Sequence, residues 1–189
     1  MTGEFDGQIV ESLGSPEARQ RVLALRAGLR REIVTLAQWR AALSDPDVTV
    51  RRESLTLLAY ESLDFDEVAP LVLAALDDED ALVVDGAIFA LAEHLYCGSV
   101  EQLNTIALGH EDARCRESAV AALGAIGDDR GRHAVIAALE DKPAVRRRAI
   151  VALSNFEGPD IEAALARASE DRDWQVRAAV DQLTKDEPD

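Results

Sequence analysis

Four side chains of the sequence are of the types that bind metal ions: His94, Cys97, His110 and Cys115. A His-x-x-Cys pair followed by a second His and a second Cys is typical of tetrahedral zinc sites. The spacing opposes this interpretation, because the first pair ends one predicted helix and the second pair flanks the turn that begins the next. A helix of about 14 residues that rises ~1.5 Å per residue would place the two pairs roughly 15–20 Å apart. We therefore predict no metal site.

No other part of the sequence carries a motif of catalysis. It contains no Cys-x-x-Cys, no Gly-x-Ser-x-Gly, no glycine-rich phosphate loop and no dinucleotide fingerprint. Carboxylates are often adjacent, but with 36 acidic and 20 basic residues such pairs are expected by chance and are mostly solvated. We predict a protein that is not an enzyme and that has no cofactor and no catalytic residue.

The composition favours an all-α protein in the cytoplasm. Hydrophobic residues make up 48% of the chain and aromatic ones only 4%, with abundant Ala and Leu, which favours closely packed helices over a disordered chain. The formal charge of −16 should repel nucleic acid and anionic lipid. The N-terminus lacks the layout of a signal peptide, and two cysteines are too few for a disulfide framework. We expect a soluble, unexported protein with both cysteines reduced.

The helices that would position any site form an internal repeat. The repeated unit has an apolar residue, then Arg, then a small or apolar residue three positions later. With this Arg as the anchor, the equivalent positions are 51, 84, 116, 146 and 177, which gives steps of 33, 32, 30 and 31 residues. Each anchor follows an acidic turn, and a leucine that ends another apolar stretch precedes four of these turns. Each unit therefore reads as helix A, acidic turn, helix B.

The register predicts the bounds of the elements. The predicted A helices are 30–43, 67–76, 99–108, 130–139 and 159–168, and the predicted B helices are 48–62, 81–96, 113–125, 144–156 and 174–184. Ser99 and Gln102 have the spacing of a capping box for the third A helix. Residues 1–29 are expected to form an N-terminal helical cap, residues 30–184 the repeats, and residues 185–189 a solvated tail.

The pattern Asp-x-x-Val-Arg-x-x-Ala-x-x-x-Leu resembles HEAT-like repeats, of the short type named after the phycobilisome lyases. The best matches lie at residues 47–51, 141–149 and 173–177, and the resemblance covers roughly residues 30–184. It implies a right-handed α-solenoid of about five HEAT-like helix pairs with an N-terminal helical cap. The family includes adaptors, bilin lyases and a metal-dependent hydroxylase, so the resemblance says little about function. The hydroxylase branch uses repeated His-Glu pairs, whereas this chain has one, His110-Glu111.

The repeated arginines are interpreted as structural. An Arg in the first turn of a helix meets an unfavourable dipole and needs a nearby carboxylate, which the acidic turn supplies. The family resemblance implies the same ladder between neighbouring units. We assign this role to Arg51, Arg116, Arg146 and Arg177.

A binding face is predicted along the B helices, which line the concave side of such solenoids. Positions two, five and nine after each anchor should project from it: Glu53, Thr56, Tyr60, Gly86, Phe89, Glu93, Ser118, Ala121, Arg148, Val151 and Asn155. Phe89 is the candidate anchor for a partner, with Tyr60 and Tyr96 beside it. In the alternative interpretation, Phe89 turns inward and fills the core.

Two further features bear on binding. The second repeat has Val84 in place of Arg, followed by Asp85 and by Gly86, which costs roughly 1 kcal/mol relative to Ala in a helix; function and drift both account for this. The acidic turns form a row that helix capping explains in part. Its members are Asp45, Asp47, Asp77, Asp78, Glu79, Asp80, Glu111, Asp112, Glu140, Asp141, Glu170, Asp171 and Asp173. The cluster at 77–80 favours a partner with a basic surface.

The sequence thus predicts a non-catalytic, bacterial scaffold, adaptor or inhibitor that binds another protein on its concave B-helix face. The predicted contact residues are Glu53, Thr56, Tyr60, Gly86, Phe89, Glu93, Tyr96, Arg148 and Asn155. One alternative is a lyase- or chaperone-like protein that binds a chromophore or other small molecule beside Phe89, His94 and Tyr96. Another is an assembly spacer that self-associates through the last helix, around Val176 and Val180.

Overall fold

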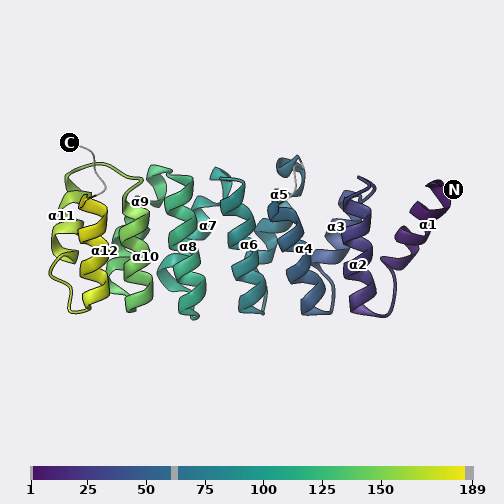
Figure 1. Ribbon diagram of the computed structural model, residues 1–189, viewed down its shortest axis with the longest axis horizontal. Helices are drawn as coiled ribbons and strands as arrows, with labels where there is room; N and C mark the ends of the chain where they lie inside the picture. The colour runs from purple at the N-terminus through teal and green to yellow at the C-terminus, as the bar shows by residue number, and fades with distance from the viewer. Residues whose placement is uncertain (1, 61–63, 186–189) are drawn as a thin grey trace. The chain divides into compact units, whose positions relative to one another are not determined.

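The computed structural model describes residues 2–60 and 64–185, and all regular elements in these ranges are helices (Figure 1). The chain divides into two compact units, Met1–Ala90 and Leu91–Asp189, and the division falls inside helix α6. None of the helices in the described ranges has the length and apolar character needed to cross a membrane. The prediction of an all-helical repeat solenoid is confirmed.

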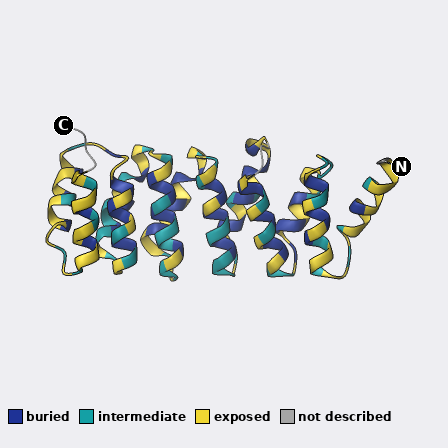
Figure 2. Ribbon diagram, viewed as in Figure 1, coloured by how far each residue is buried: buried dark blue, intermediate teal, exposed yellow. Residues whose placement is uncertain are grey.

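The N-terminal unit consists of helices that alternate between type A and type B. They are α1 (Thr2–Ser12), α2 (Ala18–Leu29), α3 (Leu36–Leu43), α4 (Val48–Tyr60), α5 (Phe65–Ala74), the short 3-10 helix η1 (Ala75–Asp77) and most of α6 (Ala81–Glu93). The helices bury one side each, which Figure 2 shows as dark blue segments that alternate with exposed ones. The core contains Leu25, Trp39, Leu55 and Leu58, which are fully buried.

The C-terminal unit continues the same alternation. Its elements after α6 are η2 (Cys97–Ser99), α7 (Val100–Gly109), α8 (Ala113–Ile126), η3 (Asp129–Gly131), α9 (Arg132–Ala137), η4 (Ala138–Glu140), α10 (Pro143–Leu153), α11 (Pro159–Ala168) and α12 (Trp174–Lys185). Leu103, Leu123, Ile150 and Leu153 form its fully buried centre. Short 3-10 turns at both ends of α9 shorten this A helix relative to the predicted range 130–139.

The B helices begin within one residue of the predicted positions, because each start is fixed by an acidic turn. The predicted end of the first B helix, at residue 62, lies outside the described residues, as do residues 186–189 of the predicted tail. The A helix predicted from residue 30 begins only at Leu36, because residues 30–35 form a turn in which Glu32 has a φ of 55°.

The capping box predicted at Ser99 is wrong. The Ser99 hydroxyl donates to the carbonyl oxygen of Tyr96 at 2.6 Å and does not accept from the start of α7. A capping box does occur at the start of α3, where the Thr35 side chain accepts from the Gln38 N–H and the Gln38 side chain accepts from the Thr35 N–H. Both sites have the right residue types, so the backbone conformation at the cap residue decides between them.

An arginine ladder joins successive repeats within each unit. Each ladder arginine lies in the first turn of a B helix and forms an ion pair with an aspartate in the next acidic turn. The pairs are Arg21–Asp45, Arg51–Asp78, Arg116–Asp141 and Arg146–Asp171. In each pair the guanidinium donates from both Nε and Nη2 to the two carboxylate oxygens. The structural role predicted for Arg51, Arg116 and Arg146 is therefore confirmed.

The ladder aspartates have a second role, because most of them also accept a backbone hydrogen bond from the start of the B helix that follows. Asp45 Oδ1 accepts from the Asp47 N–H, and Asp171 Oδ1 accepts from the Asp173 N–H. At the equivalent turn before α8 a histidine replaces the aspartate, and His110 Nδ1 accepts from the Asp112 N–H at 3.1 Å. An imidazole nitrogen therefore takes the place of the carboxylate oxygen in this turn.

Candidate functional site

Two exposed aromatic side chains of the N-terminal unit, Tyr60 and Phe89, lie on neighbouring B helices. Tyr60 ends α4 and Phe89 lies in α6, and their ring centroids are 5.7 Å apart at an interplanar angle of 61°. This edge-to-face arrangement places the positive edge of one ring against the negative face of the other. Tyr60 is 69% exposed and Phe89 is 40% exposed. The interpretation in which Phe89 fills the core is therefore wrong, and we call Tyr60 and Phe89 the aromatic pair.

The local packing of α4 and α6 explains why the two rings meet. Val50, Leu55 and Leu58 of α4 are buried, so Thr56 and Tyr60 project to the opposite, exposed side. Gly86 faces Leu55, and a Cβ at position 86 would lie 3.4 Å from Leu55 Cδ1. An alanine at position 86 would make an ordinary contact with Leu55. Phe89 follows Gly86 by three residues, about one helical turn, so it lies on the side of α6 that faces α4 and there meets Tyr60.

Charged side chains continue the same face toward α2. Arg26 of α2 forms an ion pair with the half-buried Glu53 of α4. Leu23, also in α2, is 54% exposed. Leu23 and Arg26 follow Arg21 by two and five positions, so they occupy the positions that the predicted stripe has in later repeats. The face of the N-terminal unit is therefore an exposed aromatic pair beside an apolar and a charged segment.

The C-terminal unit presents a more polar B-helix face. Arg148 and Val151 of α10 and Asn155, in the turn after it, are exposed as predicted, and Arg148 Nη2 lies 3.6 Å from Glu117 Oε1 of α8. Ser118 and Ala121 of α8 are only half-buried, and Glu93, at the end of α6, is exposed. These side chains are exposed or half-buried on or directly after the B helices, as the repeat register predicts.

Tyr96, like Asn155, does not lie on a helix. It follows α6 in the connecting loop and is half-buried. Its ring lies over Gly98, where an added Cβ would be 2.6 Å from Tyr96 Cε1. The tyrosine ring thus occupies the space above a glycine and holds the turn into α7.

The thirteen acidic residues of the turns divide into three groups. Four accept the ladder arginines, namely Asp45, Asp78, Asp141 and Asp171. Four begin B helices, namely Asp47, Asp80, Asp112 and Asp173, each of which accepts from the N–H two residues later. The remaining five, Asp77, Glu79, Glu111, Glu140 and Glu170, are exposed. Local structure therefore explains eight of the thirteen, and five exposed carboxylates are left at this edge.

The ladder also controls the protonation of its carboxylates. The Arg116 guanidinium, through its hydrogen bonds, holds the pKa of Asp141 below its usual value, and Arg146 does the same for Asp171. The pKa of Arg116 is raised by its hydrogen bond to Asp141. These groups remain charged at neutral pH and have no role as acids or bases.

The histidines and cysteines do not gather into a metal site in the described part of the chain, where no three His, Cys, Asp or Glu side chains are placed to hold an ion. Cys97 is exposed and Cys115 is buried, and the two are not joined in a disulfide. The B-helix faces of the two units are the surfaces that the arrangement offers for binding.

The C-terminal repeats are similar to those of a known family. Residues 100–183 match the family described as HEAT repeats. The repeats in this part of the chain are HEAT repeats. The finer assignment of the repeats to the phycobilisome-lyase type stays a prediction. A comparison of the chain with curated proteins finds no match.

Solved structures of repeat proteins share its fold. A designed armadillo repeat protein, solved in complex with the peptide (KR)4, has 17% identity and a TM-score of 0.69 over 94% of this chain and 97% of its own. An engineered protein has 19% identity and a TM-score of 0.67 over 95% of both chains. The Escherichia coli protein YIBA_ECOLI has 20% identity and a TM-score of 0.65 over 93% of this chain and 68% of its own. At these identities the likeness concerns the fold alone.

Sequence reasoning missed the part that α2 plays in the repeats. Arg21 lies 30 residues before Arg51, within the range of the other steps, and donates to Asp45 as the later anchors donate to their aspartates. Ser15 occupies the turn position of the ladder aspartates, and its hydroxyl accepts from the Glu17 N–H. This repeat was not recognised because its turn has a serine at the position of the ladder aspartate. The spacing of 30 residues between Arg21 and Arg51 could have revealed it.

Proposed function

We propose that this HEAT-like repeat protein is a non-catalytic scaffold that binds another protein on the B-helix face, with the aromatic pair as its apolar anchor. The observation that carries the proposal is the exposed contact of Tyr60 with Phe89. Aromatic side chains lose little conformational entropy on binding and dominate the affinity of many interfaces. The two rings restrain one another, so the anchor is partly ordered before a partner arrives.

The proposed partner has a basic segment beside the residue that contacts the aromatic pair. The formal charge of −16 favours encounter with a basic surface, and the five exposed carboxylates of the turns add local charge of the same sign. The designed armadillo repeat protein with this fold was solved with a peptide of alternating lysine and arginine, which supports a basic ligand for this chain by analogy. We place this role, as an adaptor or an inhibitor, in a bacterial cytoplasm.

The experiment compares capture of partners by three purified proteins. The wild type, the variant Tyr60→Ala/Phe89→Ala and the control Leu108→Ala are immobilised and incubated with a bacterial lysate. Leu108 is an exposed apolar residue of the A helix α7, so the control removes exposed apolar surface away from the proposed face. We expect the double variant to lose the partners that the wild type and the control retain, and the retained partners to elute at high salt.

Retention of every partner by the double variant would show that the aromatic pair is not the anchor. Elution that does not change between low and high salt would contradict the proposed basic partner, because screening weakens attraction between exposed charges.

A further inference from the structure

The packing of successive B helices differs within the C-terminal unit. Helices α8 and α10 approach closely through Gly124 and Ala152, since a Cβ at position 124 would lie 2.5 Å from Ala152 Cβ. Gly124 is eight residues after the anchor Arg116, and Ala152 is six after Arg146. The equivalent positions in the next pair of B helices, α10 and α12, hold Ser154 and Leu183. These larger side chains do not permit the same close contact.

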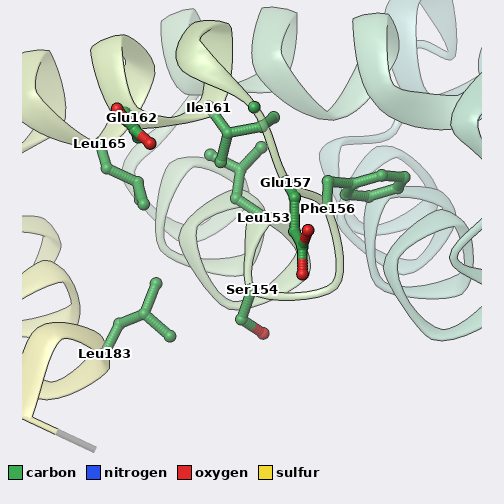
Figure 3. A pocket seen from close by; sticks show the side chains of 9 residues that line it. Leu153, Ser154, Phe156, Glu157, Ile161, Glu162, Leu165 and Leu183 are labelled. Atoms are coloured by element: carbon green, nitrogen blue, oxygen red, sulfur yellow. The ribbon is translucent and has the colours of Figure 1, made fainter. Parts of the chain in front are cut away.

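A pocket of about 500 Å³ opens at this point. Figure 3 shows its lining residues around an open space, with Leu183 on the α12 side and Ser154 and Leu153 on the α10 side. The lining comprises Leu153, Ser154, Phe156, Glu157, Gly158, Ile161, Glu162, Leu165 and Leu183. This volume lies within the range of about 300–1,000 Å³ that is usual for ligand sites. The pocket therefore has room for a side chain or a short peptide segment.

The chemistry of the lining combines an apolar wall with negative charge. Leu153, Ile161 and Phe156 are buried, and Leu165 and Leu183 are half-buried. Glu157 and Glu162 are exposed and are the ionisable residues among those that line the pocket. Neither carboxylate forms an ion pair with a basic residue of the described chain. The nearby Arg132 is directed to the Glu157 carbonyl oxygen and to Asp160.

We infer that this pocket binds a basic amphipathic peptide segment of a partner protein, with an arginine or lysine over Glu157 and Glu162 and an adjoining apolar side chain against the leucines. Long basic side chains suit such a lining because their methylene stems pack on apolar surface while their charged ends meet carboxylates. A segment rich in acidic residues is disfavoured by the same two carboxylates. This second site does not depend on the aromatic pair.

The test measures fluorescence anisotropy of two labelled peptides of equal length. One alternates leucine with arginine, and the other alternates leucine with glutamate. The protein is used as wild type, as Glu157→Gln/Glu162→Gln, and as the control Asp66→Asn/Glu67→Gln, which removes the same charge from two exposed residues of the A helix α5. We also use Ser154→Trp, which fills the pocket, and Tyr60→Ala/Phe89→Ala.

We expect the arginine peptide to bind the wild type and the glutamate peptide not to bind. The pocket charge variant should weaken binding about fivefold or more, and the control charge variant less than about twofold. Ser154→Trp should abolish binding, and Tyr60→Ala/Phe89→Ala should leave it unchanged. Methyl resonances of Leu165 and Leu183 should shift on titration with the arginine peptide.

Three results would each overturn the inference: binding of both peptides alike, equal weakening by the two charge variants, or loss of binding in Tyr60→Ala/Phe89→Ala. If Ser154→Trp does not fold, the comparison of the two charge variants tests the inference. These variants should fold, because the residues that they change are exposed. Circular dichroism establishes folding of every variant before titration.

Discussion

Arg116 and Asp141 form a bidentate ion pair that joins successive repeats. The arginine Nε and Nη2 atoms lie 2.6 and 2.7 Å from Asp141 Oδ2 and Oδ1, and the arginine Nη1 donates to the His110 carbonyl oxygen at 2.7 Å. All three nitrogens of the guanidinium therefore have an acceptor. The two charged side chains are 14% and 18% exposed, so solvent screens the pair only in part.

Asp141→Asn should destabilise the protein at neutral pH and change how its stability depends on pH. Because the folded-state pKa of Asp141 is lowered, its contribution is present above the unfolded value of about 3.9 and is lost as the pH falls through the lower folded value. We expect a loss of about 1–3 kcal/mol at pH 7 and a smaller loss near pH 3. Urea unfolding at several pH values measures both.

The neighbouring Glu140 is exposed and serves as the control for that measurement. Glu140→Gln should unfold like the wild type at pH 7. A constant difference between Asp141→Asn and the wild type from pH 7 to pH 3 would show that the charge of Asp141 does not stabilise the fold.

Gly124→Ala should be destabilising although alanine is the better helix former. The new methyl group would lie 2.5 Å from Ala152 Cβ and 2.7 Å from Ala152 Cα, so α8 and α10 would have to separate. Overpacking of this kind costs about 1–3 kcal/mol, against a gain of about 1 kcal/mol from helix propensity. Gly109→Ala, at the end of α7, meets nothing within 4 Å and should leave the melting temperature equal or higher. Equal melting temperatures for Gly124→Ala and Gly109→Ala would contradict the close packing.

Thr35→Ala should lower stability by about 1 kcal/mol because it removes half of the capping box of α3. Thr105 is an exposed threonine inside α7 whose hydroxyl donates to the Glu101 carbonyl oxygen, so Thr105→Ala tests the same chemical change without a cap. Denaturant unfolding should separate the two variants. If Thr105→Ala loses as much stability as Thr35→Ala, the Thr35 side chain does not stabilise α3 as a cap.

A double-mutant cycle on Tyr60 and Phe89 should give a coupling free energy of about 0.5–1.5 kcal/mol, the range for edge-to-face rings. Each single alanine variant should have only a slightly lower free energy of unfolding than the wild type, because both rings are partly exposed. The comparison cycle pairs Tyr60→Ala with Leu36→Ala, an exposed leucine of α3, and should be additive. Additivity in the first cycle would mean that the rings do not support one another.

Much of the fold was predictable because it depends on local signals. The acidic turns and the arginines after them fix the starts of the B helices, and the period between arginines places Tyr60 and Phe89 on one face. The fate of Phe89 was not predictable in the same way. Its surroundings depend on how α6 packs beside α4, where its ring meets Tyr60, and this is a property of two helices together.

The pocket of the C-terminal unit could not be predicted either. It arises where Ser154 and Leu183 replace the close pair Gly124 and Ala152, and the sequence does not give the space left between helices. The missed capping box at Thr35 has a related cause, since Ser99 offers the same side-chain chemistry on a backbone that does not point its oxygen toward the helix.

Where a repeat carries the ladder arginine, its B helix supplies the donor and the turn of the next repeat supplies the acceptor. Because the same ion pair recurs, a repeat accepts an arginine from the preceding repeat and donates its own arginine to the following one. Duplication or deletion of a whole repeat would leave both residues of the ion pair intact. The ladder pairs span 24 to 27 residues, so small changes of length inside a repeat are also accommodated. An array built in this way gains or loses reach in whole modules.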